Sequence, residues 1–163
     1  LEYLQQIMQS VLFPESVNAK QRFGLTTDDY RFLYKYMATL PPQTDYPKYD
    51  TTEFFDSYTK FFMFRSGKSN IPPYIKVLNK TGWSYGFLTD IAYVVDLKNK
   101  VEFMLSGTIY VNRDGVLNDD KYEYDELGYP FFKEVGNIIY LYELKRNRTF
   151  IPDLSKFNVV EEQ

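Results

Sequence analysis

Apolar residues in the N-terminal third of the chain recur at the spacing of α-helices. In residues 1–12 they fall three or four positions apart, which places them on one helical face. A second helix is predicted over residues 26–40, because Thr26 and Asp29 have the spacing of a capping box and two prolines end the pattern. A third helix is predicted over residues 51–62, where aromatic side chains share one helical face.

The pattern of the chain changes after Gly67. Three strands are predicted, over residues 74–80, 87–96 and 101–112, with a turn between Gly82 and Gly86 and a short polar link between the second and third strands. In the third strand a glycine interrupts the apolar row, either as a bulge or where another backbone comes close. A closing helix is predicted to begin at a first-turn proline. Its expected buried stripe is Phe131, Val135, Ile138, Ile139 and Tyr142.

These elements predict an α+β fold built as one domain segment over residues 1–163. Residues 1–66 form its helical part, and residues 67–163 hold an antiparallel three-stranded meander with helices packed on it. The third strand would leave a long apolar edge, which natural proteins avoid. We therefore expect residues 101–112 to pair with polypeptide outside this chain, either a missing N-terminal half or a second chain.

Composition and charge exclude several classes of function. The 163 residues include no cysteine and no histidine, so thiolate and imidazole metal sites and Ser-His-Asp or Cys-His catalysis are excluded within the chain. The net charge of −3 offers no concentrated basic face for nucleic acid, and no apolar run is long enough for a membrane span. The acidic stretch 113–127 lacks the spacing of a calcium loop and is interpreted as a solvated loop. We expect neither a metal nor a cofactor.

Aromatic residues make up 19% of the chain. Most fall at core-facing positions, so we interpret them mainly as packing residues. The alternative is a stacking platform for sugars or bases. A possible glycan-facing patch would consist of Tyr110, Tyr122, Tyr124 and Tyr129.

The best candidate for chemistry is the tripeptide Lys80-Thr81-Gly82, at the end of the first predicted strand. One S-x-x-K sequence also occurs, from Ser57 to Lys60, inside the third predicted helix. We interpret Ser57 as an ordinary solvent-side position of that helix and not as a nucleophile.

In its context the tripeptide resembles the K-T-G strand of class A β-lactamases and penicillin-binding proteins. The chain is similar, more closely, to β-lactamase-related serine hydrolases of Bacteroidetes-type bacteria. The similarity covers nearly the whole chain and includes the stretches NKTGWSYGFLTDIAYVVD, VEFMLSGTIYVNRDGVLNDDKYEYDELGYPF and IPDLSKF. It implies the second half of a β-lactamase/transpeptidase-like fold, with a periplasmic or cell-surface location.

The resemblance also implies a role for each residue of the motif. Lys80 would place a cation beside the attacking serine and the carboxylate of a small acyl substrate, and Thr81 would offer that carboxylate a hydroxyl. Gly82 would let the substrate backbone approach, and the backbone N–H of Trp83 would contribute to the oxyanion hole.

The family's S-x-x-K nucleophile and S-D-N element precede the matched region. The resemblance therefore implies the C-terminal part of a serine hydrolase that cleaves an amide or ester, of β-lactam or peptidoglycan type, through an acyl-enzyme. The chain alone is expected to be inert. The alternative is a non-enzymatic, aromatic-rich domain that binds a glycan or a protein.

Overall fold

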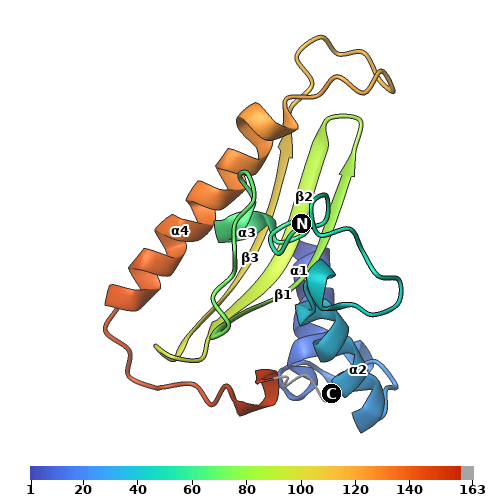
Figure 1. Cartoon of the computed structure of the whole chain (residues 1–163). Helices are drawn as coiled ribbons and strands as arrows, with labels where there is room; N and C mark the ends of the chain where they lie inside the picture. The colour runs from blue at the N-terminus through green and yellow to red at the C-terminus, as the bar shows by residue number, and fades with distance from the viewer. Residues whose placement is uncertain (159–163) are drawn as a thin grey trace.

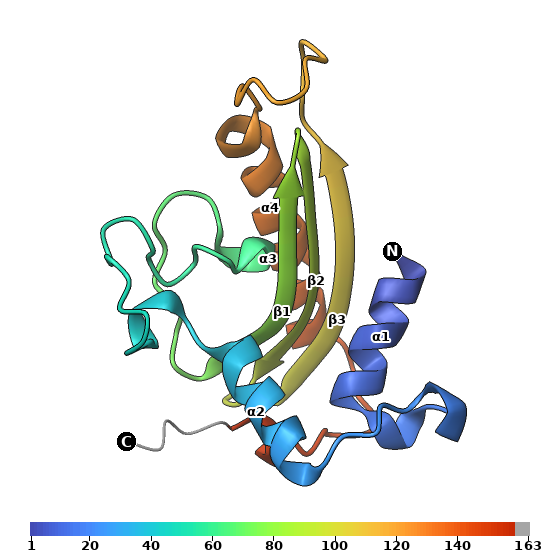
Figure 2. The ribbon, with the colours of Figure 1, turned by 90° about the vertical axis from the view of Figure 1, so that its right-hand side faces the viewer.

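The computed structural model describes residues 1–158 and has an α+β architecture. A three-stranded antiparallel sheet in the order β1-β2-β3 is formed by β1 (Ile75–Ser84), β2 (Phe87–Asp96) and β3 (Val101–Tyr110). The helices are α1 (Glu2–Leu12), α2 (Thr27–Ala38), α3 (Phe61–Phe64) and α4 (Tyr129–Lys145). Figures 1 and 2 show the sheet between two layers, with α3 and α4 on one side and α1 and α2 on the other. The predicted α+β class and the three-stranded meander are confirmed.

The core consists of two clusters, one on each face of the sheet. Strand β2 is central, so its residues feed both clusters. One cluster, on the side of α4, contains Leu88, Ala92 and Val94 from this strand, and the other contains Ile91, Tyr93 and Val95. A central strand with both faces covered carries apolar residues almost continuously, which explains the run over positions 91–95.

The second predicted helix forms with the expected cap. The backbone N–H of Asp29 donates to Thr26 Oγ1 at 3.2 Å, and Asp29 Oδ2 accepts from the Thr26 N–H at 2.8 Å. This reciprocal pair satisfies two N–H groups that a helix start leaves without partners.

The turn between β1 and β2 lies further along the chain than predicted. Tyr85 and Gly86 have φ angles of 51° and 93°, as a two-residue type I′ hairpin requires, and Ser84 pairs with Phe87 across the turn. A Cβ on residue 86 would lie 2.5 Å from the Cβ of Asn112, so glycine is required there. The strand therefore continues through Gly82 instead of ending before it.

The predicted third helix is wrong. Residues 51–60 form turns, and α3 is a single turn in which Phe62 and Met63 have non-helical backbone angles. The aromatic residues have helical spacing, but the polar residues between them are also buried: Ser57 is 0% exposed and Lys60 is 2% exposed. An amphipathic helix would place these two side chains in solvent. Ser57 is thus not a solvent-side helical position, and its Oγ accepts a hydrogen bond from the Ser69 N–H at 3.2 Å.

Helix α4 begins as predicted, with a proline in its first turn, but it buries a different face. The expected stripe included Phe131, Ile138 and Tyr142, and these are 42%, 63% and 60% exposed. The buried residues are Tyr129, Phe132 and Gly136, which face α3 and the sheet. Because both sides of α4 carry apolar residues, periodicity alone did not identify the side that faces the core.

Gly107 is not at a bulge, since β2 and β3 keep an unbroken register through it. A Cβ there would lie 3.2 Å from the rings of Phe62 and Phe132, so the glycine makes room for aromatic side chains and not for a backbone.

Replacing Gly136 with alanine is expected to destabilise the fold by about 1–3 kcal/mol through overpacking. The new Cβ would lie 2.5 Å from the backbone nitrogen of Met63, and this atom cannot move without shifting α3. The clash outweighs the gain of about 1 kcal/mol that alanine has over glycine in helices. Urea unfolding measures the difference. Gly24→Ala is the control, because no atom lies within 4 Å of its Cβ position. A Gly136→Ala variant as stable as the parent would contradict this packing.

Candidate functional site

The predicted site residues lie in the half of β1 nearest the hairpin turn. Lys80 and Gly82 are exposed, Thr81 is half-buried and Trp83 is 45% exposed. The Lys80 Nζ donates a hydrogen bond to the Thr81 carbonyl at 2.8 Å. No atom lies within 4 Å of the position that a Cβ on Gly82 would take. The tripeptide is therefore accessible, with open space beside its glycine.

The backbone of this segment faces an open edge of the sheet. In the described part of the chain, strand β1 pairs with β2 alone. The two-residue turn makes Ser84 and Phe87 a hydrogen-bonded pair. Bonded and non-bonded positions alternate along an antiparallel ladder, so the N–H and C=O groups of Thr81 and Trp83 point away from β2. Consistent with this alternation, the carbonyls of Val77 and Thr81 accept hydrogen bonds from lysine side chains. The Trp83 N–H is thus directed to the free side of the strand.

The side chains of the segment divide between the two faces of the sheet. Thr81 and Trp83 share the face of Val77, on the side of α4, and Lys80 and Gly82 lie on the opposite face. The Trp83 ring packs against Phe61, with ring centroids 5.9 Å apart. The accessible part of the tripeptide is therefore its backbone edge. The Lys80 side chain lies on one face of the sheet beside this edge, and the Thr81 side chain lies on the other.

A buried polar network lies directly below this segment. Lys60 Nζ donates hydrogen bonds to the carbonyls of Met37 and Val77 and to Asn79 Oδ1, at 2.7, 2.9 and 2.8 Å. Asn79 Nδ2 in turn donates to Asp90 Oδ1 at 3.0 Å. The network joins the end of α2, the segment before α3, β1 and β2. Asn79 immediately precedes Lys80, so the network fixes the part of β1 from which the open edge extends.

Burial dominates the electrostatics of this network. Burial lowers the pKa of Lys60 to about 8, against the opposing effect of the Asp90 carboxylate. Burial raises the pKa of Asp90 to about 7, against the hydrogen bond from Asn79 and the nearby Lys60 ammonium. Among the described residues, Asp90 Oδ2 has no hydrogen-bond partner. Spacing along the chain did not predict this network, although Lys60 and Asp90 are charged residues next to apolar stretches.

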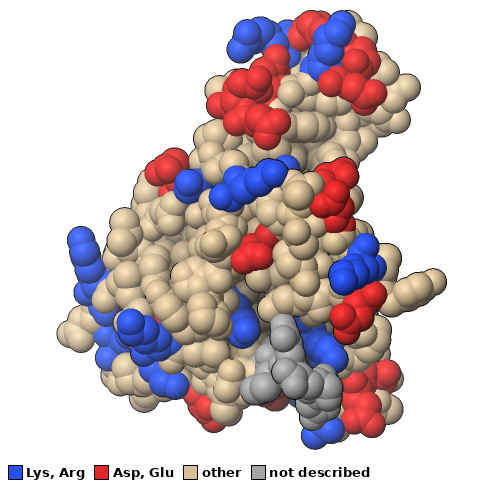
Figure 3. Space-filling model, in the orientation of Figure 1, with Lys and Arg blue, Asp and Glu red and all other residues tan. Residues whose placement is uncertain are grey.

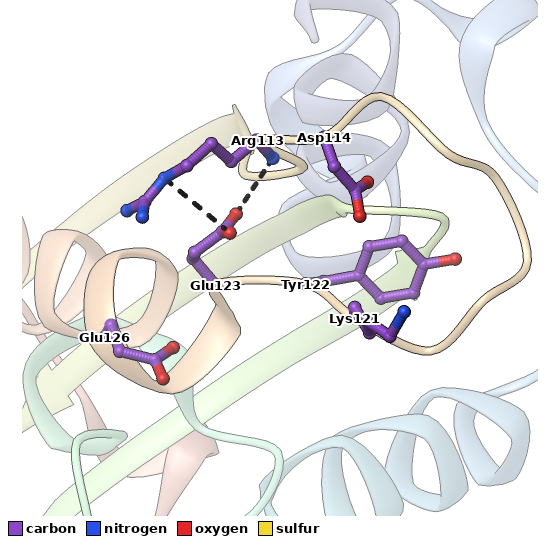
Figure 4. A pocket seen from close by; sticks show the side chains of 6 residues that line it. All are labelled: Arg113, Asp114, Lys121, Tyr122, Glu123 and Glu126. Atoms are coloured by element: carbon purple, nitrogen blue, oxygen red, sulfur yellow. Dashed lines mark hydrogen bonds and ion pairs between the residues drawn. The ribbon is translucent and has the colours of Figure 1, made fainter.

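The hairpin end of the sheet carries a second feature, an aromatic cavity of about 360 Å³. Its lining residues are Trp83, Ser84, Tyr85, Asp120, Tyr122 and Tyr124. Tyr122 also borders a neighbouring cavity of about 340 Å³, where Arg113 contacts Glu123 (Figure 4). Acidic and basic side chains gather at this end of the molecule in Figure 3. The strand with the K-T-G sequence and the acidic loop therefore meet at one end of the fold.

The four tyrosines considered as a glycan-facing patch do not form one surface. Tyr129 is 7% exposed and belongs to the core. Tyr122 and Tyr124 are half-buried and line the aromatic cavity, whereas Tyr110 is exposed and packs on Phe87, with ring centroids 4.5 Å apart. Only two of the four tyrosines therefore contribute to the cavity.

Within residues 1–158 there is no group of three or more carboxylate, histidine or cysteine side chains arranged to hold a metal ion. The helices of this part of the chain are too short or too polar to cross a membrane.

Comparison with known proteins gives no match. No protein-family model matches the chain, and no curated protein or solved structure does so either. The function therefore has to be inferred from the geometry of the chain itself.

Proposed function

We propose that this chain is the C-terminal part of a β-lactamase-like serine hydrolase that cleaves an amide or ester through an acyl-enzyme. One observation carries the proposal: the sequence Lys80-Thr81-Gly82 lies on an edge strand whose backbone is open to an incoming substrate. The substrate would lie along this edge, with its carbonyl oxygen at the Trp83 N–H. Open space at Gly82 admits the substrate backbone.

In the proposed reaction, groups along this edge stabilise charge and bind the substrate. The oxygen of a serine from the N-terminal half bonds to the carbonyl carbon, and the Trp83 N–H stabilises the negative oxygen that develops. The serine hydroxyl loses its proton as the new C–O bond forms, and the leaving amine or alcohol gains a proton as its bond to the carbonyl carbon breaks. Water then adds to the acyl carbon, which releases the acid and restores the serine hydroxyl. Lys80 supplies a positive charge beside the edge, and Thr81 supplies a hydroxyl for a substrate carboxylate.

Two exposed surfaces of the described residues are where the proposed N-terminal half would pack. Within residues 1–158, strand β3 pairs with β2 alone, so no described strand lies along its other edge. Helix α4 packs over β3 (Figure 1). Several of its apolar side chains are exposed. These side chains are Phe131, Ile138, Leu141 and Tyr142. The proposed N-terminal half would add strands to the free edge of β3 and cover this face of α4. A periplasmic or cell-surface location remains part of the same proposal.

Trp83 allows a sharp test, because its backbone N–H and its side chain can be removed separately. In the full-length gene product, Trp83→Pro removes both, whereas Trp83→Ala removes only the side chain. Proline is tolerated at an edge position whose N–H makes no ladder bond, so the variant is expected to fold. We expect Trp83→Pro to lower kcat/KM for nitrocefin or a p-nitrophenyl ester about 10²–10³-fold relative to Trp83→Ala.

Further variants of the full-length protein complete this experiment. Lys80→Ala is expected to reduce kcat/KM strongly, whereas Lys76→Ala, on the same face of the same strand, leaves it unchanged. Ser57→Ala is expected to retain activity, and the 163-residue chain alone to show none. A full-length protein without hydrolase activity, or equal activity in the proline and alanine variants, would overturn the proposal.

A second candidate is the non-enzymatic binding domain, and the aromatic cavity favours it. Under this alternative the sequence encoded before Leu1 contains no S-x-x-K segment, and the full-length protein does not react with a fluorescent penicillin. Labelling of an upstream serine would exclude the alternative.

A further inference from the structure

The aromatic cavity at the hairpin end is built from two separate segments that hold each other in place. The hairpin supplies Trp83 and Tyr85, and the loop after β3 supplies Tyr122 and Tyr124. The Tyr124 hydroxyl accepts a hydrogen bond from the Gly86 N–H at 2.8 Å, which ties the loop to the hairpin. The cavity is therefore part of the folded structure and does not need a ligand to form.

Two of the three tyrosine hydroxyls of this cavity, those of Tyr122 and Tyr124, already have partners. The Tyr122 hydroxyl accepts from the Asn118 N–H at 2.9 Å, as the Tyr124 hydroxyl does from Gly86. The two rings lie 5.2 Å apart and tilted by 42°. The cavity offers aromatic rings beside a carboxylate, and this combination favours a ligand that binds to π-systems and carries a positive charge.

One acidic side chain lines the cavity, and the loop that supplies it carries an excess of acidic residues. Asp120 is exposed at its rim, and the neighbouring Lys121 forms its ion pair with Asp119, at 3.5 Å. Arg113, the other cation of the loop, contacts Glu123 at 3.9 Å. Residues 113–126 hold six acidic and two basic side chains in all. Ring faces together with an excess of carboxylates are the chemistry that recognises an organic cation.

We propose that this cavity binds an organic cation, an alkylammonium group held against the rings of Trp83, Tyr85 and Tyr122 beside the Asp120 carboxylate. The cavity begins at Trp83, whose N–H is the proposed oxyanion donor. It is therefore the subsite for a positively charged substituent close to the scissile carbonyl. This role as a substrate subsite rests on the proposed function, but the binding of the cation does not.

The expected affinity is modest. Each cation–π contact contributes about 0.5–2 kcal/mol, so two or three contacts give a dissociation constant in the millimolar range. Trp83 is the only tryptophan of the chain, and its fluorescence reports binding in this cavity directly.

The test is a fluorescence titration of the 163-residue chain with choline at constant ionic strength. We expect a saturable change at millimolar concentrations, and no saturable change with 3,3-dimethylbutan-1-ol, the uncharged analogue of choline. Asp120→Asn is expected to weaken binding about fivefold, since it removes one nearby charge. Asp125→Asn is the matched control, because this exposed carboxylate belongs to the same loop but does not line the cavity.

Three results would overturn the cation site: no saturable change with choline in the folded chain, equal binding of the uncharged analogue, or equal weakening by the two aspartate substitutions. Saturable binding of N-acetylglucosamine oligomers that Asp120→Asn leaves unchanged would assign the cavity to a saccharide instead. The titration needs no serine nucleophile. Choline binding without hydrolase activity in the full-length protein would thus reject the proposed function and keep the cation site. Hydrolase activity without choline binding would reject the cation site and keep the proposed function.

Discussion

Replacing Lys60 with methionine is expected to lower the free energy of unfolding by about 3–5 kcal/mol, because it breaks a buried charge network by removing one partner. The substitution leaves the carbonyls of Met37 and Val77 and the Asn79 amide without their donor. It also leaves the buried Asp90 carboxylate without its nearest opposing charge. Methionine fills similar space, so the loss arises from polarity and not from a cavity. Urea unfolding, followed by circular dichroism, measures it.

Two further variants show whether the network is the cause. Lys80→Met changes an exposed lysine on β1 and is expected to alter the free energy of unfolding by less than about 0.5 kcal/mol. Adding Asp90→Asn to Lys60→Met removes the carboxylate that has lost its counter-charge, so the double variant should regain part of the stability. A Lys60→Met protein as stable as the Lys80→Met protein would show that Lys60 is not held as the structure places it.

The second large effect is a pH dependence of stability that centres on Asp90. Burial raises the pKa of Asp90 from its ordinary value of 3.8 to about 7, so its stabilising contribution is full below pH 4 and is lost as the pH rises through 7. Burial lowers the pKa of Lys60 from 10.5 to about 8, so its contribution is present above pH 10.5 and is lost as the pH falls through 8. Both contributions are smallest between pH 7 and 8.

Asp90→Asn removes the titration of the aspartate, together with the effect by which Asp90 raises the pKa of Lys60. We expect the free energy of unfolding of the parent, minus that of this variant, to fall as the pH rises from 4 to 7. The slope is at most about 1.4 kcal/mol per pH unit, the value for one proton. Above pH 8 the difference should be constant. Urea unfolding of both proteins at each pH gives the difference, and a value that does not change between pH 4 and 7 would contradict the raised pKa of Asp90.

Local patterns in the sequence were sufficient where neighbouring residues decide the structure. Apolar strand segments and the short links between them predicted the three strands and their antiparallel order. Thr26 with Asp29 predicted the start of α2. The sequence also led to Lys80-Thr81-Gly82, and the structure places these residues on an accessible edge strand. Their catalytic role remains a prediction, because accessibility and strand position are compatible with it but do not test it.

Only the tertiary structure decided how residues 51–60 fold and which face of α4 is buried. Residues 51–60 have helical spacing, but burying Ser57 and Lys60 requires partners that come from α2, β1 and β2, far away in the sequence. Helix α4 has apolar residues on two sides, and Gly136 selects the inner one because only a glycine lets α3 approach so closely. Hydrogen-bond partners and close contacts between distant segments are properties of the packed chain, which is why spacing along the sequence predicted neither of them.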